Sequence, residues 1–221
     1  MGHKTMNTFE RLSKNKGTVS SALGKSLARG VLRDGRDDIL LECIDLVTYQ
    51  ASEAGSRNIR AGAAKVVEVV AEARPELVAP HLGRLLPALS VQEPQTRWAI
   101  IRVMGFCAHL SRSMAQKAIV FADKYLGAKE GLVIASSADL FLGDFGALSR
   151  RDAAAVFPIL ERSMQSLVTN EQDWLLESLL KVFPNLDKAA QIKALKFARR
   201  WQDASRQSTR QRARKILKLA Q

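Results

Sequence analysis

A tryptophan between two arginines is the first feature of the sequence that could do chemistry. Trp98 follows Arg97 directly, and Arg102 lies about one helical turn later in an apolar run. An aromatic ring beside cations can bind an acidic peptide or a nucleic acid. The alternative is that Trp98 packs over a neighbouring loop, because tryptophan is highly buried on average. Trp98 and Arg102, with Lys65 upstream, are therefore candidate partner-binding residues.

A second candidate surface lies in the C-terminal stretch KFARRWQDASRQSTRQRARKILKLAQ. Arg206, Arg210 and Arg214 are spaced four residues apart, Lys218 continues their stripe, and Lys215 lies beside it. On one helix face these cations could dock an acidic protein or the phosphates of a nucleic acid. The alternative is a solubilising cap, because the terminal unit of a repeat array presents a polar outer face. All five are candidate partner-binding residues.

Patterns for catalysis and metal binding are weak. The stretch VSSALGKS, ending at Ser26, imitates a phosphate-binding loop, but Val19 stands where that loop needs glycine and no strand precedes it. His3, His81 and His109 lie far apart, and none has a carboxylate three or four residues later. This spacing offers neither a metal pair nor an oriented base. We therefore expect no catalytic residue, no metal site, no cofactor and no enzymatic activity.

Composition and charge limit the class of protein that this sequence can encode. The chain has 221 residues, of which 47% are hydrophobic, so it can bury a core. Its net charge of +12 is uneven: residues 1–36 are net +6 and residues 188–221 net +10, whereas the middle is net −4. Cys43 and Cys107 lie in apolar runs without metal-ligand spacing, which is typical of reduced, buried thiols. Because there is neither a signal-like start nor a membrane-length apolar stretch, we expect a cytoplasmic protein without membrane association.

The sequence repeats itself in helical units. Alternation of β-branched residues is missing, and turn residues recur about every twenty residues, which predicts helices joined by short loops. Three stretches superimpose without gaps: NIRAGAAKVVEVVA from Asn58, QTRWAIIRVMGFCA from Gln95 and STRQRARKILKLAQ from Ser208. Weaker copies begin at Gly131 and Gln172. A helical hairpin of about 38 residues cannot bury both apolar faces alone, so it stacks on copies of itself.

This alignment superimposes Arg60, Arg97 and Arg210, and the preceding helices superimpose Pro80 on Pro158. Each proline should bend its outer helix, because it lacks an N–H group. An apolar-Arg-x-x-Ala-x-x-x-Leu pattern opening the second helix, with a proline in the first, resembles the HEAT repeat family. The resemblance implies an all-α, right-handed solenoid of about five helical hairpins. It also implies a structural role for the three arginines, which tie adjacent repeats together in that family.

Two units depart from the pattern, because Val133 and Leu175 stand where the arginine belongs, and their register stays open. Trp98 is not explained by the repeat, since its equivalents are Ala61 and Gln211. A position that tolerates small and polar residues should lie at the core edge or in solvent. We expect it on the inner-helix face, which is concave in HEAT-like solenoids.

The organisation along the chain follows from these repeats. We expect residues 1–16 to form a basic, loosely ordered N-terminal arm and residues 17–221 to form a single HEAT-like domain with an N-terminal cap helix. The hairpins are expected at about 36–73, 75–111, 112–146, 149–185 and 187–221.

An enzymatic precedent exists among HEAT-like proteins. Some alkylpurine DNA glycosylases have this type of fold and use an aspartate, an arginine and aromatics in a basic cleft. Residues of matching type here are Asp139, Asp144, Asp173, Trp174 and Glu177. The middle of this chain is net acidic and poor in aromatics, and Trp174 occupies a position expected in the core. Fold analogy alone is weak evidence for activity, so this is the least favoured hypothesis.

The preferred interpretation is a non-catalytic scaffold or adaptor. It would bind another protein, of unknown identity, along its inner-helix face or at its basic end, where an acidic protein would fit. The alternative is a nucleic-acid-binding protein that uses the basic C-terminal helices. We expect a monomer.

Overall fold

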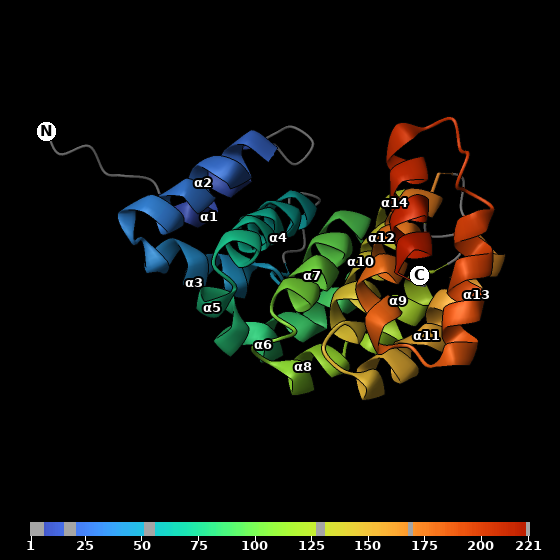
Figure 1. The fold of residues 1–221 in the computed structure, drawn as a ribbon. Coiled ribbons are helices and arrows are strands. Elements are labelled where there is room, and N and C mark those ends of the chain that lie inside the picture. The colour runs from blue at the N-terminus through green and yellow to red at the C-terminus, as the bar shows by residue number, and fades with distance from the viewer. Residues whose placement is uncertain (1–6, 16–20, 51–55, 127–130, 168–169, 220–221) are drawn as a thin grey trace, which may run out of the picture. The chain divides into compact units, whose positions relative to one another are not determined.

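The computed structural model describes residues 7–15, 21–50, 56–126, 131–167 and 170–219. All regular elements in these ranges are helices and no strand occurs among them (Figure 1), so the prediction of an all-α protein is confirmed. Contacts divide the chain into two compact units, residues 1–103 and 104–221. Whether residues 17–221 act as one domain stays a prediction.

The first unit is centred on α4, which packs against α1, α2, α3 and α5. Its elements are α1 (Thr8–Ser13), α2 (Ser21–Asp34), α3 (Asp37–Leu46), α4 (Ser56–Ala73), α5 (Pro75–Val78), η1 (Ala79–His81), α6 (Leu82–Leu85), η2 (Leu86–Ser90) and α7 (Pro94–Phe106). The last of these, α7, continues three residues beyond the end of the unit at residue 103. Lys25, which belongs to the stretch that resembles a phosphate-binding loop, lies inside α2. Fully buried Leu27, Ile44, Val67 and Ile100 belong to its core.

Helix α1 corrects the expectation of a loosely ordered N-terminal arm. The Asn7 side chain accepts a hydrogen bond from the backbone N–H of Glu10 at 2.8 Å, and the Glu10 carboxylate accepts one from Asn7 N–H. This capping box satisfies two N–H groups at the helix start. Leu12 is 1% exposed, and the Glu42 carboxylate accepts the N–H of Phe9 at 3.0 Å. Residues 8–13 are therefore an anchored helix, while residues 1–6 lie outside the described residues.

The two prolines act differently on their helices. Pro80 lies in η1, between the short helices α5 and α6, so the segment before α7 is interrupted as expected. Pro158, in contrast, lies inside α11, which continues from Arg150 to Gln165. Both Pro158 and Ala154 are exposed, so water can bond the Ala154 carbonyl that a proline four residues later leaves without a helical donor. Pro80 thus lies at an interruption between helices, whereas the bend expected at Pro158 stays a prediction.

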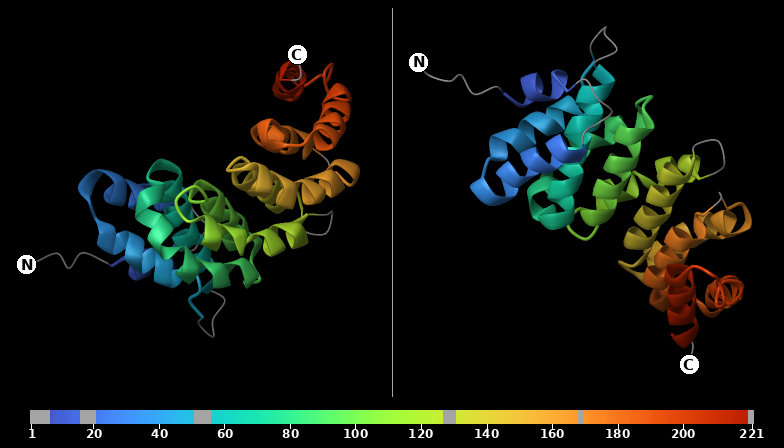
Figure 2. Two further views of the ribbon diagram at one scale, coloured as in Figure 1. Left: turned by 60° about the horizontal axis from the view of Figure 1, so that its bottom comes forward. Right: turned by 90° about the horizontal axis from the view of Figure 1, so that it is seen from above.

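In the second unit, α10 packs against α9, α11 and α12, and α14 packs against α12 and α13. Figures 1 and 2 show α10, α12 and α14 following one another within this unit. Its elements are α8 (Arg112–Gln116), α9 (Ile119–Tyr125), α10 (Leu132–Gly146), α11 (Arg150–Gln165), α12 (Gln172–Val182), η3 (Phe183–Asn185), α13 (Lys188–Arg199) and α14 (Gln207–Lys218). The predicted boundaries near 75, 112, 149 and 187 coincide with helix starts or N-caps.

Close helix contacts explain two glycines of α10. A Cβ atom at Gly143 would lie 2.7 Å from the Cα of Ser178, and one at Gly146 would lie 2.6 Å from a methyl group of Val182. Such distances are too short for a side chain, so α10 and α12 approach closely only because these positions are glycine. Phe141 and Phe145, each fully buried, fill the space beside this contact.

Polar ties recur at nearly constant spacing along the chain. Each joins an acidic residue to a basic residue 35 to 39 positions later, about one repeat unit. The pairs are Asp45–Arg84 in the first unit and, in the second, Asp123–Arg162, Asp144–Lys181 and Glu177–Arg212. The first two pairs are exposed and the last two are half-buried. An exposed ion pair contributes little stability, typically below ~1 kcal/mol. The regular spacing of the four pairs is nevertheless a structural counterpart of the sequence repeat.

Candidate functional site

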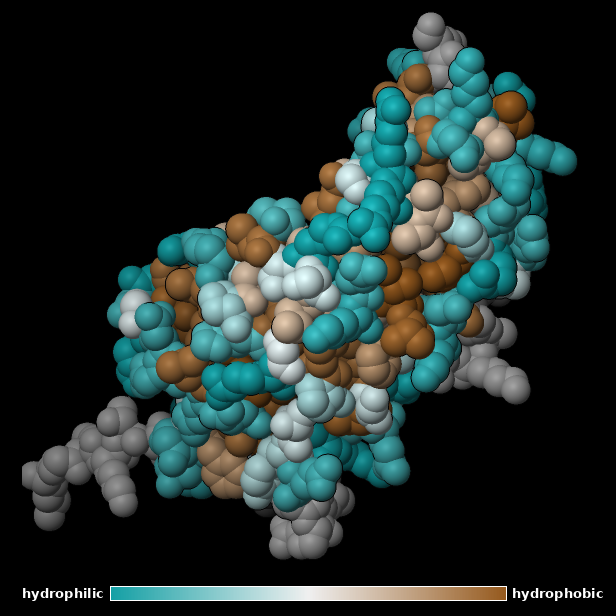
Figure 3. Space-filling view, turned by 90° about the horizontal axis from the view of Figure 1, so that it is seen from below, coloured by the Kyte–Doolittle hydropathy of each residue, from teal (hydrophilic) through white to brown (hydrophobic). Residues whose placement is uncertain are grey.

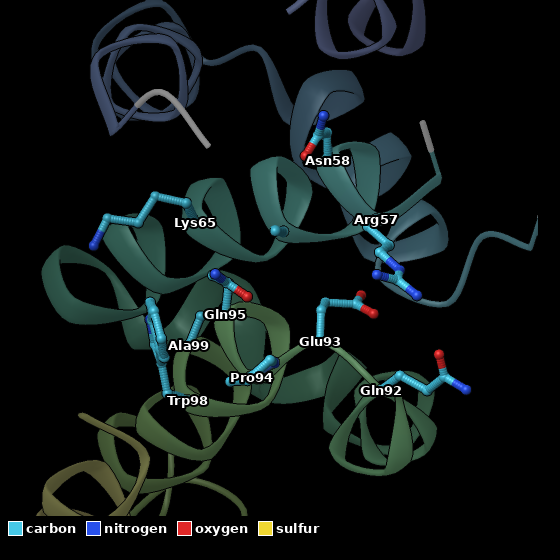
Figure 4. A pocket seen from close by; sticks show the side chains of 10 residues that line it. Arg57, Asn58, Lys65, Gln92, Glu93, Pro94, Gln95, Trp98 and Ala99 are labelled. Atoms are coloured by element: carbon cyan, nitrogen blue, oxygen red, sulfur yellow. The ribbon is translucent and has the colours of Figure 1, made fainter. Parts of the chain in front are cut away.

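A groove of about 740 Å³ lies between α4 and the first turns of α7, entirely within the first unit. Lys65 and Trp98 lie at one end of it and Arg57 and Gln92 at the other (Figure 4). Two of the residues chosen from the sequence, Lys65 and Trp98, therefore share one site.

Small side chains open this groove. Ala61 on α4 and Ala99 on α7 line it, together with Pro94, which begins α7, and the half-buried ring of Trp98. Ala61 and Trp98 each directly follow one of the arginines that the sequence alignment superimposes. They are therefore at equivalent positions of that alignment. Positions that the sequence alignment superimposes, on α4 and on α7, thus supply both walls.

Hydrogen-bonding side chains surround the apolar surface. Asn58, Gln92 and Gln95 line the groove and carry carboxamide groups, each of which can donate and accept hydrogen bonds. Gln92 and Gln95 are exposed and Asn58 is half-buried. Such groups suit a ligand that has both donors and acceptors.

Two cations stand on the α4 wall. The Lys65 ammonium lies 2.7 Å from a carboxylate oxygen of Glu68. The stem of Lys65 passes close to Gly24, where a Cβ atom would lie 3.0 Å from Lys65 Cγ. Arg57 is exposed and forms no ion pair with any described residue. A ligand can therefore reach the whole Arg57 guanidinium and the remaining donors of Lys65.

The carboxylate of Glu93 is already engaged. Arg60 donates to it from Nε at 2.5 Å and from Nη2 at 2.9 Å, and Thr96 Oγ1 donates at 2.9 Å. Burial alone would raise the pKa of Glu93, but the hydrogen bonds from Arg60, from its own backbone N–H and from Thr96 lower it below the ordinary value. Glu93 is thus ionised, and its charge is compensated within the protein.

The repeat arginines also anchor loops. Arg60 Nη1 donates to the carbonyl of Tyr49 at 2.7 Å, and Arg210 Nη1 donates to the carbonyl of Ala204 at 2.7 Å. Each bond joins the second helix of a pair to the connection that precedes it. Arg60 additionally binds Glu93, which precedes α7, whereas the bonds described for Arg210 reach only Ala204 and Ser205 before α14. That the three arginines tie adjacent repeats together stays a prediction. Arg97 is half-buried on α7.

The prediction from sequence omitted part of this site and included one residue that lies outside it. Arg102 is half-buried on α7 but does not line the groove. Arg57 and Gln95 line it and were not singled out. The available signal was spacing, since Arg57, Ala61 and Lys65 are four residues apart and share one helix face.

The C-terminal arginines have intramolecular contacts. Arg206 Nε lies 3.0 Å from the buried Asp173 carboxylate, and Arg214 binds both the Gln202 carbonyl and the Asp203 carboxylate. With Arg210 bonded to Ala204, three members of the predicted stripe contribute to the structure around α14. Their role in partner binding stays a prediction.

Other cations of this region are exposed without an ion pair to any described residue. Lys215 and Lys218 belong to the original prediction, whereas Lys196 and Arg199 on α13 and Arg200 at its C-cap were not selected. Arg200 lies over the ring of Phe197, 5.7 Å from its centre.

The carboxylates considered for glycosylase chemistry are used internally. Asp173 accepts from Ser208 at 2.8 Å and from Thr209. Asp144 pairs with Lys181, and Glu177 pairs with Arg212. Trp174 is half-buried on α12, rather than fully buried as expected.

The fourth of these carboxyl groups, Asp139, has an unusual partner. Asp139 is 0% exposed on α10, Glu171 is 1% exposed before α12, and the two side chains are hydrogen-bonded. Ser163 of α11 donates to Asp139 Oδ1 at 3.1 Å. Burial, followed by the charge and hydrogen bond of Glu171, raises the pKa of Asp139 well above its ordinary value. A shared proton explains how two carboxyl groups stay together in the core.

Metal-ligating clusters and helices able to span a membrane are both missing from the described ranges. These residues contain no cluster of three or more His, Cys, Asp or Glu side chains that could hold a metal ion. No helix among them is long and apolar enough to cross a membrane. Cys43 and Cys107 are both buried, and burial raises the pKa of the Cys43 thiol. His81 is half-buried, His109 is exposed, and His3 lies outside the described residues.

Exposed large hydrophobic residues are dispersed. They are Leu41, Leu110, Val120, Val133, Ile192 and Leu219. On the face drawn in Figure 3, hydrophilic residues surround several small hydrophobic areas and a larger one near the middle. Single exposed apolar residues are normal for a folded protein and do not mark an interface.

Comparison with known proteins identifies a similar fold but no family. The chain is similar to an engineered protein of known crystal structure, with a TM-score of 0.67 and 14% identity over 96% of each chain. No protein-family model matches the sequence, and no curated protein matches it.

Proposed function

We propose that this chain is a HEAT-like α-solenoid scaffold, a non-catalytic and monomeric cytoplasmic adaptor that binds another protein through the groove between α4 and α7. The recurrent polar ties, the repeat-equivalent groove walls and the paired helices support the repeat architecture. Five hairpins at the boundaries expected from the sequence remain part of this proposal.

One observation carries the functional part of the proposal. The groove combines the half-buried ring of Trp98 with carboxamides and an exposed arginine, while its carboxylate is neutralised by Arg60. Aromatic and arginine side chains in a partly enclosed site are typical of residues that dominate protein–protein binding. Catalysis would instead require an accessible acid, base or nucleophile.

The test removes the ring and measures partner binding. Trp98→Ala should weaken binding of a co-purified partner at least ~30-fold, the effect of losing a ~2 kcal/mol hot spot. The thermal midpoint should change little, since the ring lies at the core edge. Ile192→Ala is the matched control, because it truncates an apolar side chain that is 65% exposed on α13. Equal partner binding by the wild type and Trp98→Ala would contradict the proposal.

The second candidate function is nucleic-acid binding at the C-terminal end. It is favoured by the exposed cations Lys196, Arg199, Arg200, Lys215 and Lys218, which have no ion pair with a described residue. For duplex DNA, Lys215→Gln with Lys218→Gln should make the slope of log affinity against log salt shallower by ~1.8, about 0.9 per phosphate contact. Arg33→Gln with Lys117→Gln, which removes two exposed cations elsewhere, is the control. An unchanged slope would reject this candidate.

A further inference from the structure

The groove side chains define the chemistry of a ligand. We propose that the groove binds an extended peptide segment carrying two acidic side chains four residues apart, with a small apolar side chain between them. This inference rests on the proposed function, because it specifies the partner at the same groove.

Charge at the groove selects an acidic ligand. Arg57 is exposed and without an ion pair to a described residue, and Lys65 uses one contact for Glu68. An ammonium group has three donors, so Lys65 can bind a second carboxylate. Glu93 does not cancel these charges, because Arg60 already forms two hydrogen bonds with it. A ligand along α4 therefore meets Arg57, unpaired among the described residues, and the remaining donors of Lys65, whose charge is shared with Glu68, and it meets no uncompensated carboxylate from the lining residues.

The spacing of the cations selects the form of the ligand. The Cα atoms of Arg57 and Lys65, eight residues apart on α4, are about 12 Å apart along the helix at 1.5 Å per residue, and their side chains extend towards opposite ends of the groove (Figure 4). In an extended peptide, side chains i and i+4 point to the same side and lie about 13 Å apart. Side chain i+2 points to that side as well, midway between them. It would face Ala61, which lies midway between the cations and leaves room for an apolar group.

The remaining lining residues suit a peptide backbone. An extended segment has N–H and C=O groups that need hydrogen-bond partners when water is displaced. Asn58, Gln92 and Gln95 can supply donors and acceptors, and Trp98 supplies a flat apolar surface. A single-stranded nucleic acid would instead need a continuous track of cations and stacking rings. The groove has one ring and two cations separated by an alanine, so the peptide is the better match.

The experiment is selection of a random displayed-peptide library on the immobilised full chain. Peptides that bind the wild type but not Trp98→Ala should share two acidic residues at i and i+4. Arg57→Glu with Lys65→Glu should lower affinity for those peptides at least ~10-fold, because like charges facing across an interface cost several kcal/mol. The same variant should select basic residues at the two positions. Circular dichroism melting would show that each variant is folded.

A control variant separates local charge from net charge. Arg33→Glu with Lys117→Glu changes two exposed cations outside the groove and alters net charge by the same amount. It should keep the acidic preference of the wild type. Loss of that preference in the control would overturn the inference, because the selectivity would then follow net charge.

The outcomes distinguish this inference from the proposed function. Trp98-dependent peptides without the acidic pair would overturn the inference and leave groove binding in place. Failure to obtain any Trp98-dependent peptide would overturn both. Binding of a single-stranded RNA probe that Trp98→Ala abolishes, in place of peptide binding, would assign the groove to nucleic acid.

Discussion

Two buried carboxyl groups, Glu93 in the first unit and Asp139 in the second, are stabilised in opposite ways. Glu93 is bound by the Arg60 guanidinium, and the net effect lowers its pKa. Asp139 is bound by another carboxyl group, Glu171, and its pKa is raised. Helices can thus be joined through a buried acid either by an opposite charge or by a retained proton. The two solutions should respond oppositely to pH.

The signs follow from proton binding in the folded and unfolded chains. A lowered pKa means that the unfolded chain binds the Glu93 proton more tightly, so this stabilisation is present above the ordinary glutamate pKa. It is lost as pH falls through the folded-state pKa. A raised pKa means that the folded chain retains the Asp139 proton, so stability is lost as pH rises from the ordinary aspartate pKa towards the folded-state pKa.

The largest expected effect comes from removing the cation of the first pair. Arg60→Met should lower the free energy of unfolding near pH 7 by about 3 kcal/mol or more, because it leaves Glu93 charged and buried. The loss should shrink at acidic pH, where Glu93 is protonated. Urea unfolding at several pH values measures both effects. The double variant Arg60→Met with Glu93→Leu should recover much of the stability, and failure to recover would show that the arginine acts mainly through Tyr49.

A smaller, pH-dependent effect is expected at the second pair. The amide in Asp139→Asn can donate to Glu171 and accept from Ser163, so it imitates the protonated acid. The variant should be as stable as the wild type at acidic pH and more stable at alkaline pH. The wild type should lose up to ~1.4 kcal/mol per pH unit through this group within its titration range. A wild-type curve parallel to that of the variant would refute the shared proton.

The smallest expected effects come from the hydroxyl groups that complete the two sites. Thr96→Val removes a donor to Glu93, and Ser163→Ala removes a donor to Asp139. Each should cost about 1 kcal/mol, the net value of a typical hydrogen bond. The thermal midpoint should fall by roughly 2–4 °C for a chain of this size. A loss confined to Thr96→Val would show that Ser163 adds nothing to the carboxyl pair.

The starts of several helices could be predicted from the sequence because they depend on local signals. Apolar spacing defines helix faces, and Pro75, Ser149 and Asp187 mark helix starts through their own backbone or side-chain chemistry. Helix α1 was missed although its signal, Asn7 followed by Glu10, is local too. The all-α class needed nothing beyond these patterns.

The candidate site was only half predictable. Trp98 was conspicuous because neither Ala61 nor Gln211 resembles it at the equivalent repeat positions. Arg57 looked like any other exposed arginine until α4 and α7 were placed around a common groove. Conversely, Arg206 looked available for a partner, but the fold brings Asp173 within 3.0 Å of it.

Sequence alone therefore determined the all-α class and the chemical types of the helix faces, since each depends on residues within a few turns of one another. Tertiary structure alone decided which charges are compensated. Asp139 and Glu171 are 32 positions apart in the sequence. They meet only where α10, α11 and the start of α12 come together. The physical reason is that a charge is governed by groups within a few ångströms in space, whatever their distance along the chain.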